Sequence, residues 1–140
     1  KIIHLIGTNG KGTTGRFLAT ALFSLGKKVG HYTSPHILNF NERIWLNANE
    51  VSDKILNTAH IELLKLLSQD DADSLSYFEY TTLLAMYIYQ DVEYVVLEAG
   101  LGGERDATAV FAKHLTHVTP MDIDHEAFLG SDIASIATTK

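Results

Sequence analysis

The chain has 140 residues, of which 46% are hydrophobic and 20% charged, with a formal net charge of −6 at pH 7 and no cysteine. This composition is typical of one soluble globular domain or part of one. Its acidic balance argues against a dedicated nucleic-acid-binding protein, which normally carries a basic face. Without cysteine, any metal ion must be held by oxygen or imidazole ligands. No apolar run reaches the roughly 20 residues of a membrane-spanning helix, so we expect a cytoplasmic protein.

The first predicted unit is a strand over residues 2–6, a loop of small residues, and a helix over residues 16–25. Glycines let the loop backbone approach an anion, and the loop amides and the helix N-terminus carry partial positive charge. Lys11 adds a full positive charge. The loop is therefore predicted to bind the phosphates of a nucleotide. The predicted contacts are Thr8, Asn9, Gly10, Lys11, Gly12, Thr13 and Thr14.

The spacing of this loop departs from the strict triphosphate pattern G-x-x-x-x-G-K-[ST]. Leu5 stands in place of the first glycine, and Gly12 separates Lys11 from the first hydroxyl. Three glycines also spell the dinucleotide pattern G-x-G-x-x-G, which requires an acid at the end of the second strand. The predicted second strand, residues 29–32, has no such acid. A triphosphate loop is favoured, with a dinucleotide loop and an ordinary strand-to-helix turn as alternatives.

Helices and strands alternate along the rest of the chain. After the strand at 29–32, we predict an irregular functional loop at 33–44, a helix at 53–68 capped by Ser52, an acidic surface turn at Gln69–Ser74, an apolar helix at 77–90, a buried strand at 94–97, a glycine-rich loop at 100–103, a strand at 115–119 and a helix starting at 131. This alternation predicts an α/β fold, a mostly parallel sheet flanked by helices. Both ends of the chain look cut, and we expect a fragment of a longer protein.

Ligands of parallel sheets gather beyond the carboxyl ends of the strands. The phosphate loop, residues 33–36, Glu98 and residues 122–125 all follow predicted strands. A carboxylate at a buried strand end is costly unless it is paired or binds a cation, so Glu98 is interpreted as a metal ligand or general base. A loop-bracing role for Glu98 is the alternative. Thr13 is a candidate magnesium ligand, with Thr14 as its competitor.

The histidines are less decisive. His125 follows the last strand, but a lone histidine is usually structural and Mg²⁺ prefers oxygen ligands. His36 follows Ser34 and Pro35 in the irregular loop and is a modest candidate. His4 lies in the first predicted strand and receives no role.

Several motifs occur together and cover nearly the whole chain. They are Gly7-Thr8-Asn9-Gly10-Lys11-Gly12-Thr13, Ser34-Pro35-His36, Phe40-Asn41-Glu42-Arg43-Ile44, Phe78-Glu79-Tyr80-Thr81-Thr82, Glu98-Ala99-Gly100-Leu101-Gly102-Gly103, Asp106-Ala107-Thr108, Asp124-His125, Leu129-Gly130, and Ile136-Ala137 with Lys140. The set resembles folylpolyglutamate synthase and dihydrofolate synthase of the Mur ligase superfamily. The resemblance implies the P-loop NTPase-like fold of the Mur ligase central domain.

The resemblance also implies roles for individual residues. It assigns catalytic roles to Lys11, Glu98, His125 and Lys140, metal contacts to Thr13, Ser34, Glu98, His125 and Lys140, and substrate binding to Ser34, Pro35 and His36. Lys140 matches a lysine that is carbamylated in many relatives and lies near a second metal. The chain departs from the family pattern at Glu104, Ala109 and Thr139, where relatives commonly have arginine, asparagine and glutamate.

The implied reaction is ATP- and Mg²⁺-dependent amide formation. ATP phosphorylates a carboxylate of dihydropteroate or a reduced folate, and L-glutamate attacks the acyl phosphate. The resemblance places a glutamate-binding C-terminal domain beyond residue 140, so the 140 residues are expected to form part of a single ATP-binding domain and to be inactive alone. The full-length protein is expected to be a monomer. A different P-loop hydrolase or kinase, and a non-catalytic nucleotide-binding module, are the alternatives.

Overall fold

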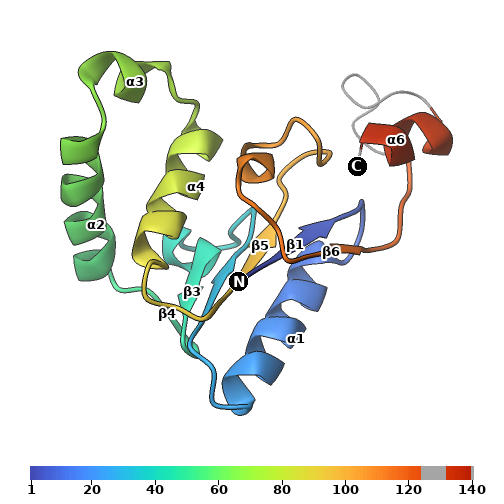
Figure 1. The fold of residues 1–140 in the computed structure, drawn as a ribbon, viewed down its shortest axis with the longest axis horizontal. Coiled ribbons are helices and arrows are strands. Elements are labelled where there is room, and N and C mark those ends of the chain that lie inside the picture. The colour runs from blue at the N-terminus through green and yellow to red at the C-terminus, as the bar shows by residue number, and fades with distance from the viewer. Residues whose placement is uncertain (124–131, 140) are drawn as a thin grey trace.

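The computed structural model describes residues 1–123 and 132–139 (Figure 1). Its strands are β1 (Ile2–Ile6), β2 (Val29–Tyr32), β3 (Ile44–Leu46), β4 (Asn49–Glu50), β5 (Tyr94–Glu98) and β6 (Leu115–Val118). Its α-helices are α1 (Lys11–Ser24), α2 (Asp53–Leu66), α3 (Gln69–Ser74), α4 (Tyr77–Ile88) and α6 (Ile133–Thr139), and its 3-10 helices are η1 (Phe40–Arg43) and η2 (Ala107–Val110). None of the helices described is long and apolar enough to span a membrane.

The strands form one sheet in the order β4-β3-β2-β5-β1-β6. Strands β2, β5, β1 and β6 run parallel, whereas β3 is antiparallel to β2 and β4 is antiparallel to β3. The register sets Leu5 beside Glu98 on one side and beside His117 on the other. The carboxyl ends of all four parallel strands therefore meet at one edge, as the predicted α/β fold requires.

Helices cover both faces of the sheet (Figure 1). Val96 packs with Ala19 of α1, whereas Val95 and Leu97 pack in the cluster that contains Ala85 of α4. Successive side chains of a strand point to opposite faces, so α1 and α4 lie on opposite sides of β5. Helix α2 packs against α4 through a separate apolar cluster. The predicted mostly parallel sheet flanked by helices is confirmed.

Two local predictions are wrong. The stretch Gln69–Ser74, predicted as a surface turn, is the short helix α3, because the Ser68 side chain accepts a hydrogen bond from the Asp71 amide at 3.1 Å and the acidic residues of its first turn favour a helix start. The first helix begins at Lys11 and not at Arg16, and the Thr14 amide donates to the Gly10 carbonyl at 2.9 Å. Much of the predicted phosphate loop is thus the first turn of α1.

The sequence analysis also missed the hairpin of β3 and β4. Its two-residue turn is Asn47 and Ala48, with φ of 47° and 74°. Positive φ at both central positions belongs to a type I′ turn, in which glycine normally takes the second place. Because alanine stands in that place, the sequence lacks the glycine that would have indicated a hairpin turn. Asn47 is held in the turn because its side chain accepts from the Val29 amide at 2.8 Å.

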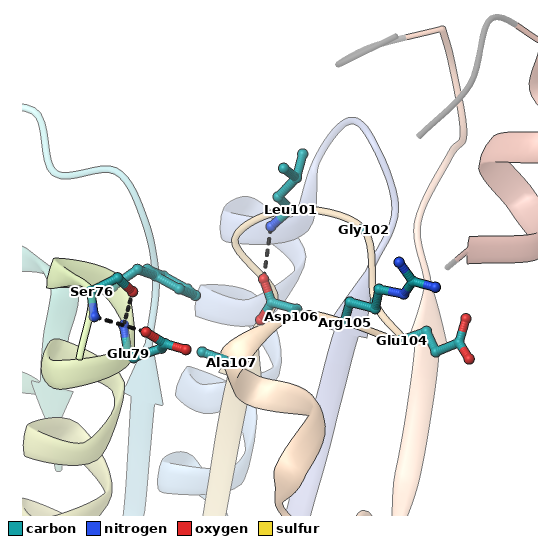
Figure 2. Close-up of a pocket in the computed structure, with 10 residues that line it drawn as sticks. Ser76, Glu79, Leu101, Gly102, Glu104, Arg105, Asp106 and Ala107 are labelled. Atoms are coloured by element: carbon teal, nitrogen blue, oxygen red, sulfur yellow. Dashed lines mark hydrogen bonds between the residues drawn. The ribbon is translucent and has the colours of Figure 1, made fainter. Parts of the chain in front are cut away.

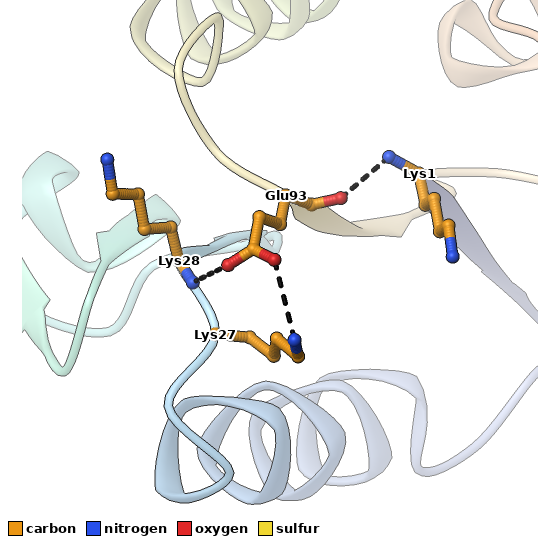
Figure 3. Close-up of polar contacts among 4 residues, drawn as sticks. All are labelled: Lys1, Lys27, Lys28 and Glu93. Atoms are coloured by element: carbon orange, nitrogen blue, oxygen red, sulfur yellow. Dashed lines mark hydrogen bonds and ion pairs between the residues drawn. The ribbon is translucent and has the colours of Figure 1, made fainter.

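At the amino ends of the strands, Glu93 ties three segments together (Figure 3). Its carbonyl accepts from the backbone nitrogen of Lys1 at 2.8 Å, and its carboxylate accepts from the Lys28 amide at 3.0 Å. The Lys27 ammonium lies 3.6 Å from the same carboxylate. These contacts fix the starts of β1, β2 and β5 at the edge opposite the predicted site.

Gly15 lies where α1 packs closely on the sheet. A Cβ atom there would lie 2.4 Å from Nε2 of His31 and 2.8 Å from Cδ1 of Leu5. The His31 ring is fully buried, and burial together with the Arg16 charge lowers the pKa of His31 to about 3. The ring is therefore neutral, and a Cβ atom at position 15 would have to displace a fully buried side chain.

We expect Gly15→Ala to destabilise the protein by about 1 kcal/mol or more. Overpacking costs about 1–3 kcal/mol, and the better helix propensity of alanine recovers at most about 1 kcal/mol. Urea unfolding of both proteins measures the difference. Thr20→Ala, at an exposed position of the same helix, is the control and should leave stability unchanged or slightly raised. Equal stability of Gly15→Ala and the wild type would contradict the packing argument.

Candidate functional site

The phosphate loop of this structure ends in an exposed helix N-terminus. Gly10 is the N-cap of α1 in the left-handed conformation, with φ of 81°, and no side chain caps the helix. The first turn contains no acidic residue. Its leading amides have no partner within the helix, and the helix dipole adds positive potential there. This end of α1 can therefore accept a phosphate group.

The end of β6 shapes the start of the loop. The amides of Thr8 and Asn9 both donate to the Pro120 carbonyl at 3.1 Å. A Cβ atom on Gly7 would lie 2.0 Å from Oγ1 of Thr119, so only glycine fits this crossing. Because the Thr8 and Asn9 amides are engaged here, the amides best placed for phosphate lie in the first turn of α1.

Lys11 folds back over the loop. Its Nζ donates to the Gly7 carbonyl at 3.0 Å and to the Thr8 carbonyl at 3.4 Å. Its charge also lowers the pKa of Glu98, although burial outweighs this effect. Lys11 and Glu98 therefore act on the same small region, between the ends of β1 and β5.

Glu98 is the last residue of β5 and is only 4% exposed. Its Oε2 accepts hydrogen bonds from the Thr33 hydroxyl and, at 3.2 Å, from the Ser34 amide. Burial raises the pKa of Glu98, against the lowering effects of these two hydrogen bonds and of Lys11. Among the described residues, hydrogen bonds reach only Oε2, so Oε1 is available to a cation.

The carboxylate and hydroxyl oxygens at and around Glu98 are ligand atoms that suit a hard cation such as Mg²⁺. A Cβ atom on Gly12 would lie 3.5 Å from Oε2 and 3.9 Å from Oε1, so the first turn of α1 adjoins the carboxylate. Thr13 follows Gly12 in that turn, and Ser34 follows Thr33. Residues 1–123 and 132–139 contain no cluster of three or more acidic or imidazole ligands. One carboxylate with hydroxyls and nucleotide phosphates is, however, a usual ligand set for Mg²⁺.

Two of the other predicted site residues, His125 and Lys140, lie outside the described residues. The structure describes the remaining ones, Ser34, Pro35 and His36. His36 accepts a hydrogen bond at its Nδ1 from Nε of Arg43 at 2.9 Å, and Arg43 is itself buried. The Ser34–Pro35 peptide bond is cis. The structure thus joins Ser34 to Glu98, and His36 to Arg43.

The loop that carries His36 is braced from within. The Glu42 carboxylate accepts from the amides of Ile37, Leu38 and Asn39, each at 2.7 Å. These three hydrogen bonds hold the pKa of Glu42 below its usual value. The predicted irregular loop is therefore an ordered turn beside the site.

A cavity of about 530 Å³ opens beyond Glu98, between the start of α4 and the glycine-rich loop (Figure 2). It is lined by Ser76, Phe78, Glu79, Leu101, Gly102, Gly103, Glu104, Arg105, Asp106 and Ala107. Ser76 and Glu79 cap α4 through reciprocal hydrogen bonds of 2.8 and 3.3 Å. Seven of the lining residues belong to three of the quoted motifs, whereas Ser76, Glu104 and Arg105 belong to none of them.

Comparison with models of known protein families finds no match. Among curated proteins, the chain is 41% identical over 141 residues to the dihydrofolate synthase/folylpolyglutamate synthase of Haemophilus influenzae. The match covers 99% of the chain and 31% of that protein. The chain thus spans about a third of the length of this relative.

Solved structures agree. Escherichia coli FolC in complex with DHPP and ADP is 38% identical, with a TM-score of 0.93 over 99% of this chain and 33% of that one. A bifunctional folylpolyglutamate synthase/dihydrofolate synthase from Yersinia pestis, complexed with AMPPNP and Mn ion, is 37% identical, with a TM-score of 0.89 over 100% of this chain and 34% of that one. The resemblance drawn from the motifs is confirmed. In sequence and in fold, the whole chain thus matches about a third of the folylpolyglutamate synthase/dihydrofolate synthase enzymes.

Proposed function

We propose that the full-length protein is an ATP-dependent carboxylate–amine ligase that joins L-glutamate to dihydropteroate, to reduced folates, or to both. The observation that carries the proposal is the meeting of Lys11, the first turn of α1 and the buried Glu98 at one sheet edge. A cavity large enough for an organic substrate lies beside this edge. The 41% identity to a dihydrofolate synthase/folylpolyglutamate synthase supports the same reaction.

The proposed reaction has two steps. A carboxylate oxygen of the pterin-containing substrate attacks the γ-phosphorus of ATP, which forms an acyl phosphate and releases ADP. The glutamate amine then attacks the acyl carbon, which forms the amide bond, releases phosphate and gives up a proton to solvent. Positioning and charge stabilisation are the main demands of phosphoryl transfer, and the amides of the first turn of α1 together with Lys11 are proposed to meet both.

Specific residues are proposed to hold the metal and the substrate. When bound, Mg²⁺ neutralises charge on the phosphate oxygens. Its proposed contacts are Thr13, Ser34, Glu98 and His125, with carbamylated Lys140 near a second metal; the proposed substrate contacts are Ser34, Pro35 and His36. Thr33 supports this site because its hydroxyl and the Ser34 amide hold Oε2 of Glu98.

The 140 residues are further proposed to form part of a single ATP-binding domain, with glutamate bound by a separate C-terminal domain. The relatives are about three times as long as the chain, which leaves room in them for a further domain. We also propose that the full-length protein is a cytoplasmic monomer that acts on small molecules. Sedimentation of the purified full-length protein tests its oligomeric state.

The test is an assay of the full-length protein with ATP, Mg²⁺, L-glutamate and either dihydropteroate or a reduced folate. We expect a product one glutamate longer, formed with equal amounts of ADP and phosphate and lost when Mg²⁺ is chelated. Leaving out glutamate is the control and should abolish the product. ATP consumption that needs neither glutamate nor a pterin would identify a hydrolase or a kinase instead.

A further inference from the structure

A chain of buried hydrogen bonds connects β1 to the wall of the cavity. Nε2 of His4 lies 2.7 Å from Oγ1 of Thr108, and that hydroxyl donates to Oδ1 of Asp106 at 2.5 Å. The three residues are 3%, 0% and 8% exposed. Asp106 lines the cavity, whereas His4 and Thr108 do not. His4 and Thr108 can therefore act on a ligand in this cavity through Asp106.

The donor and the acceptor in each of these hydrogen bonds follow from the number of protons that the side chains carry. The Thr108 hydroxyl has one proton and gives it to Asp106, so the ring of His4 must donate to Thr108 through Nε2–H. Burial lowers the pKa of His4, and the charge of Lys113 lowers it further against the opposing effect of Asp106. A neutral ring with its proton on Nε2 satisfies these contacts.

The Asp106 carboxylate closes the loop that forms the cavity wall. Its Oδ2 accepts from the Leu101 amide at 2.9 Å (Figure 2). Its Oδ1 accepts from the Thr108 amide at 2.9 Å. Between these anchors lies Gly102, with φ of 70°. The Asp106 carboxylate thus joins the start of the loop at Leu101 to its end, and Thr108 holds the carboxylate in place.

We propose that His4 and Thr108 are positioning residues for the substrate cavity, which hold the Asp106 carboxylate and the loop at 101–106 in the conformation that accepts the pterin-containing substrate. This inference rests on the proposed function. His4 stands on β1, the strand that leads into the phosphate loop three residues later. One rigid strand thus sets the position of the nucleotide loop at its end and of the cavity wall along its side.

The test uses the full-length protein and the variants Thr108→Val and Thr108→Ser. Valine keeps the shape but removes the donor to Asp106, so we expect the KM for the pterin substrate to rise about tenfold. The KM for Mg-ATP should change less than twofold. Serine restores the hydroxyl and should restore the KM. In Thr108→Val, the Leu101 amide should also exchange its hydrogen with solvent about tenfold faster, because the Asp106 carboxylate then keeps only the hydrogen bond from the backbone amide of residue 108 on its Oδ1.

His4→Phe removes the donor at the other end of the chain and should give the same pattern. If Thr108→Val does not fold, the His4→Phe variant decides the matter. His117→Gln is the control, because His117 lies exposed on the neighbouring strand β6. An unchanged pterin KM and unchanged Leu101 exchange, or an equal rise of both KM values, would overturn the inference. A wild-type protein without ligase activity would refute the proposed function. The hydrogen exchange of the Leu101 amide would then still test whether Thr108 stabilises the loop at 101–106.

Discussion

Lys11→Ala should lower the kcat/KM of ATP-dependent ligation by the full-length protein about 100- to 1,000-fold. Lys11 is the one lysine of the phosphate loop, and its Nζ donates to the Gly7 and Thr8 carbonyls at the start of that loop. Removal of one preorganised donor from a developing charge costs rates of this size. Steady-state kinetics with dihydropteroate or a reduced folate measure the loss.

The control for this variant is Lys54→Ala. Lys54 lies exposed on α2, away from the sheet edge that carries the site, and its replacement should leave kcat/KM unchanged. Near wild-type activity of Lys11→Ala would show that the loop does not hold the reacting phosphates. That result would favour the alternative interpretations of the loop, a dinucleotide-binding loop or an ordinary strand-to-helix turn.

Glu98→Gln should weaken the Mg²⁺-dependent binding of nucleotide about 10- to 100-fold. The substitution keeps the size of the side chain and removes its charge, and hydrogen bonds or contacts to a charged group are worth about 1.5–3 kcal/mol. Titration of the full-length protein with an ATP analogue at several Mg²⁺ concentrations measures the change. Glu62→Gln, on the outer helix α2, is the control and should bind as the wild type does.

The same variant separates a metal ligand from a loop brace. Burial raises the pKa of Glu98, which means that the protein without metal disfavours its charge. A neutral glutamine at this position should therefore leave the melting temperature of the metal-free protein unchanged or raise it. A lower melting temperature together with normal Mg²⁺ dependence would identify Glu98 as a brace for Thr33 and Ser34 and not as a metal ligand.

Much of the sheet could be predicted because its strands are short apolar runs. The predicted strand at 29–32 agrees with β2, and the predicted helix at 53–68 agrees with α2 except at its last residues. Ser52 caps α2 as predicted, since its side chain accepts from the Ile55 amide at 3.4 Å. These features depend on neighbours in the sequence, and local patterns describe such neighbours well.

Features that depend on distant neighbours escaped prediction. The positive φ angles at Asn47 and Ala48 follow from pairing between strands, and no glycine in the sequence indicates them. Helix α1 extends back to Lys11 through glycines and threonines of low helix propensity. The position of this first turn beside Glu98 is set by packing of α1 on the sheet, not by propensity.

The sequence by itself determined the alternation of strands and helices, and with it the edge at which the phosphate loop, Ser34 and Glu98 meet. Parallel strands bring their carboxyl ends together whatever the side chains in between, so order along the chain was sufficient. Only the tertiary structure decided that Thr33 and Ser34 hold Glu98, that a cavity opens beyond it, and that His4 reaches Asp106 through Thr108. His4 and Thr108 are 104 positions apart, and a contact over such a separation exists only after the sheet has formed.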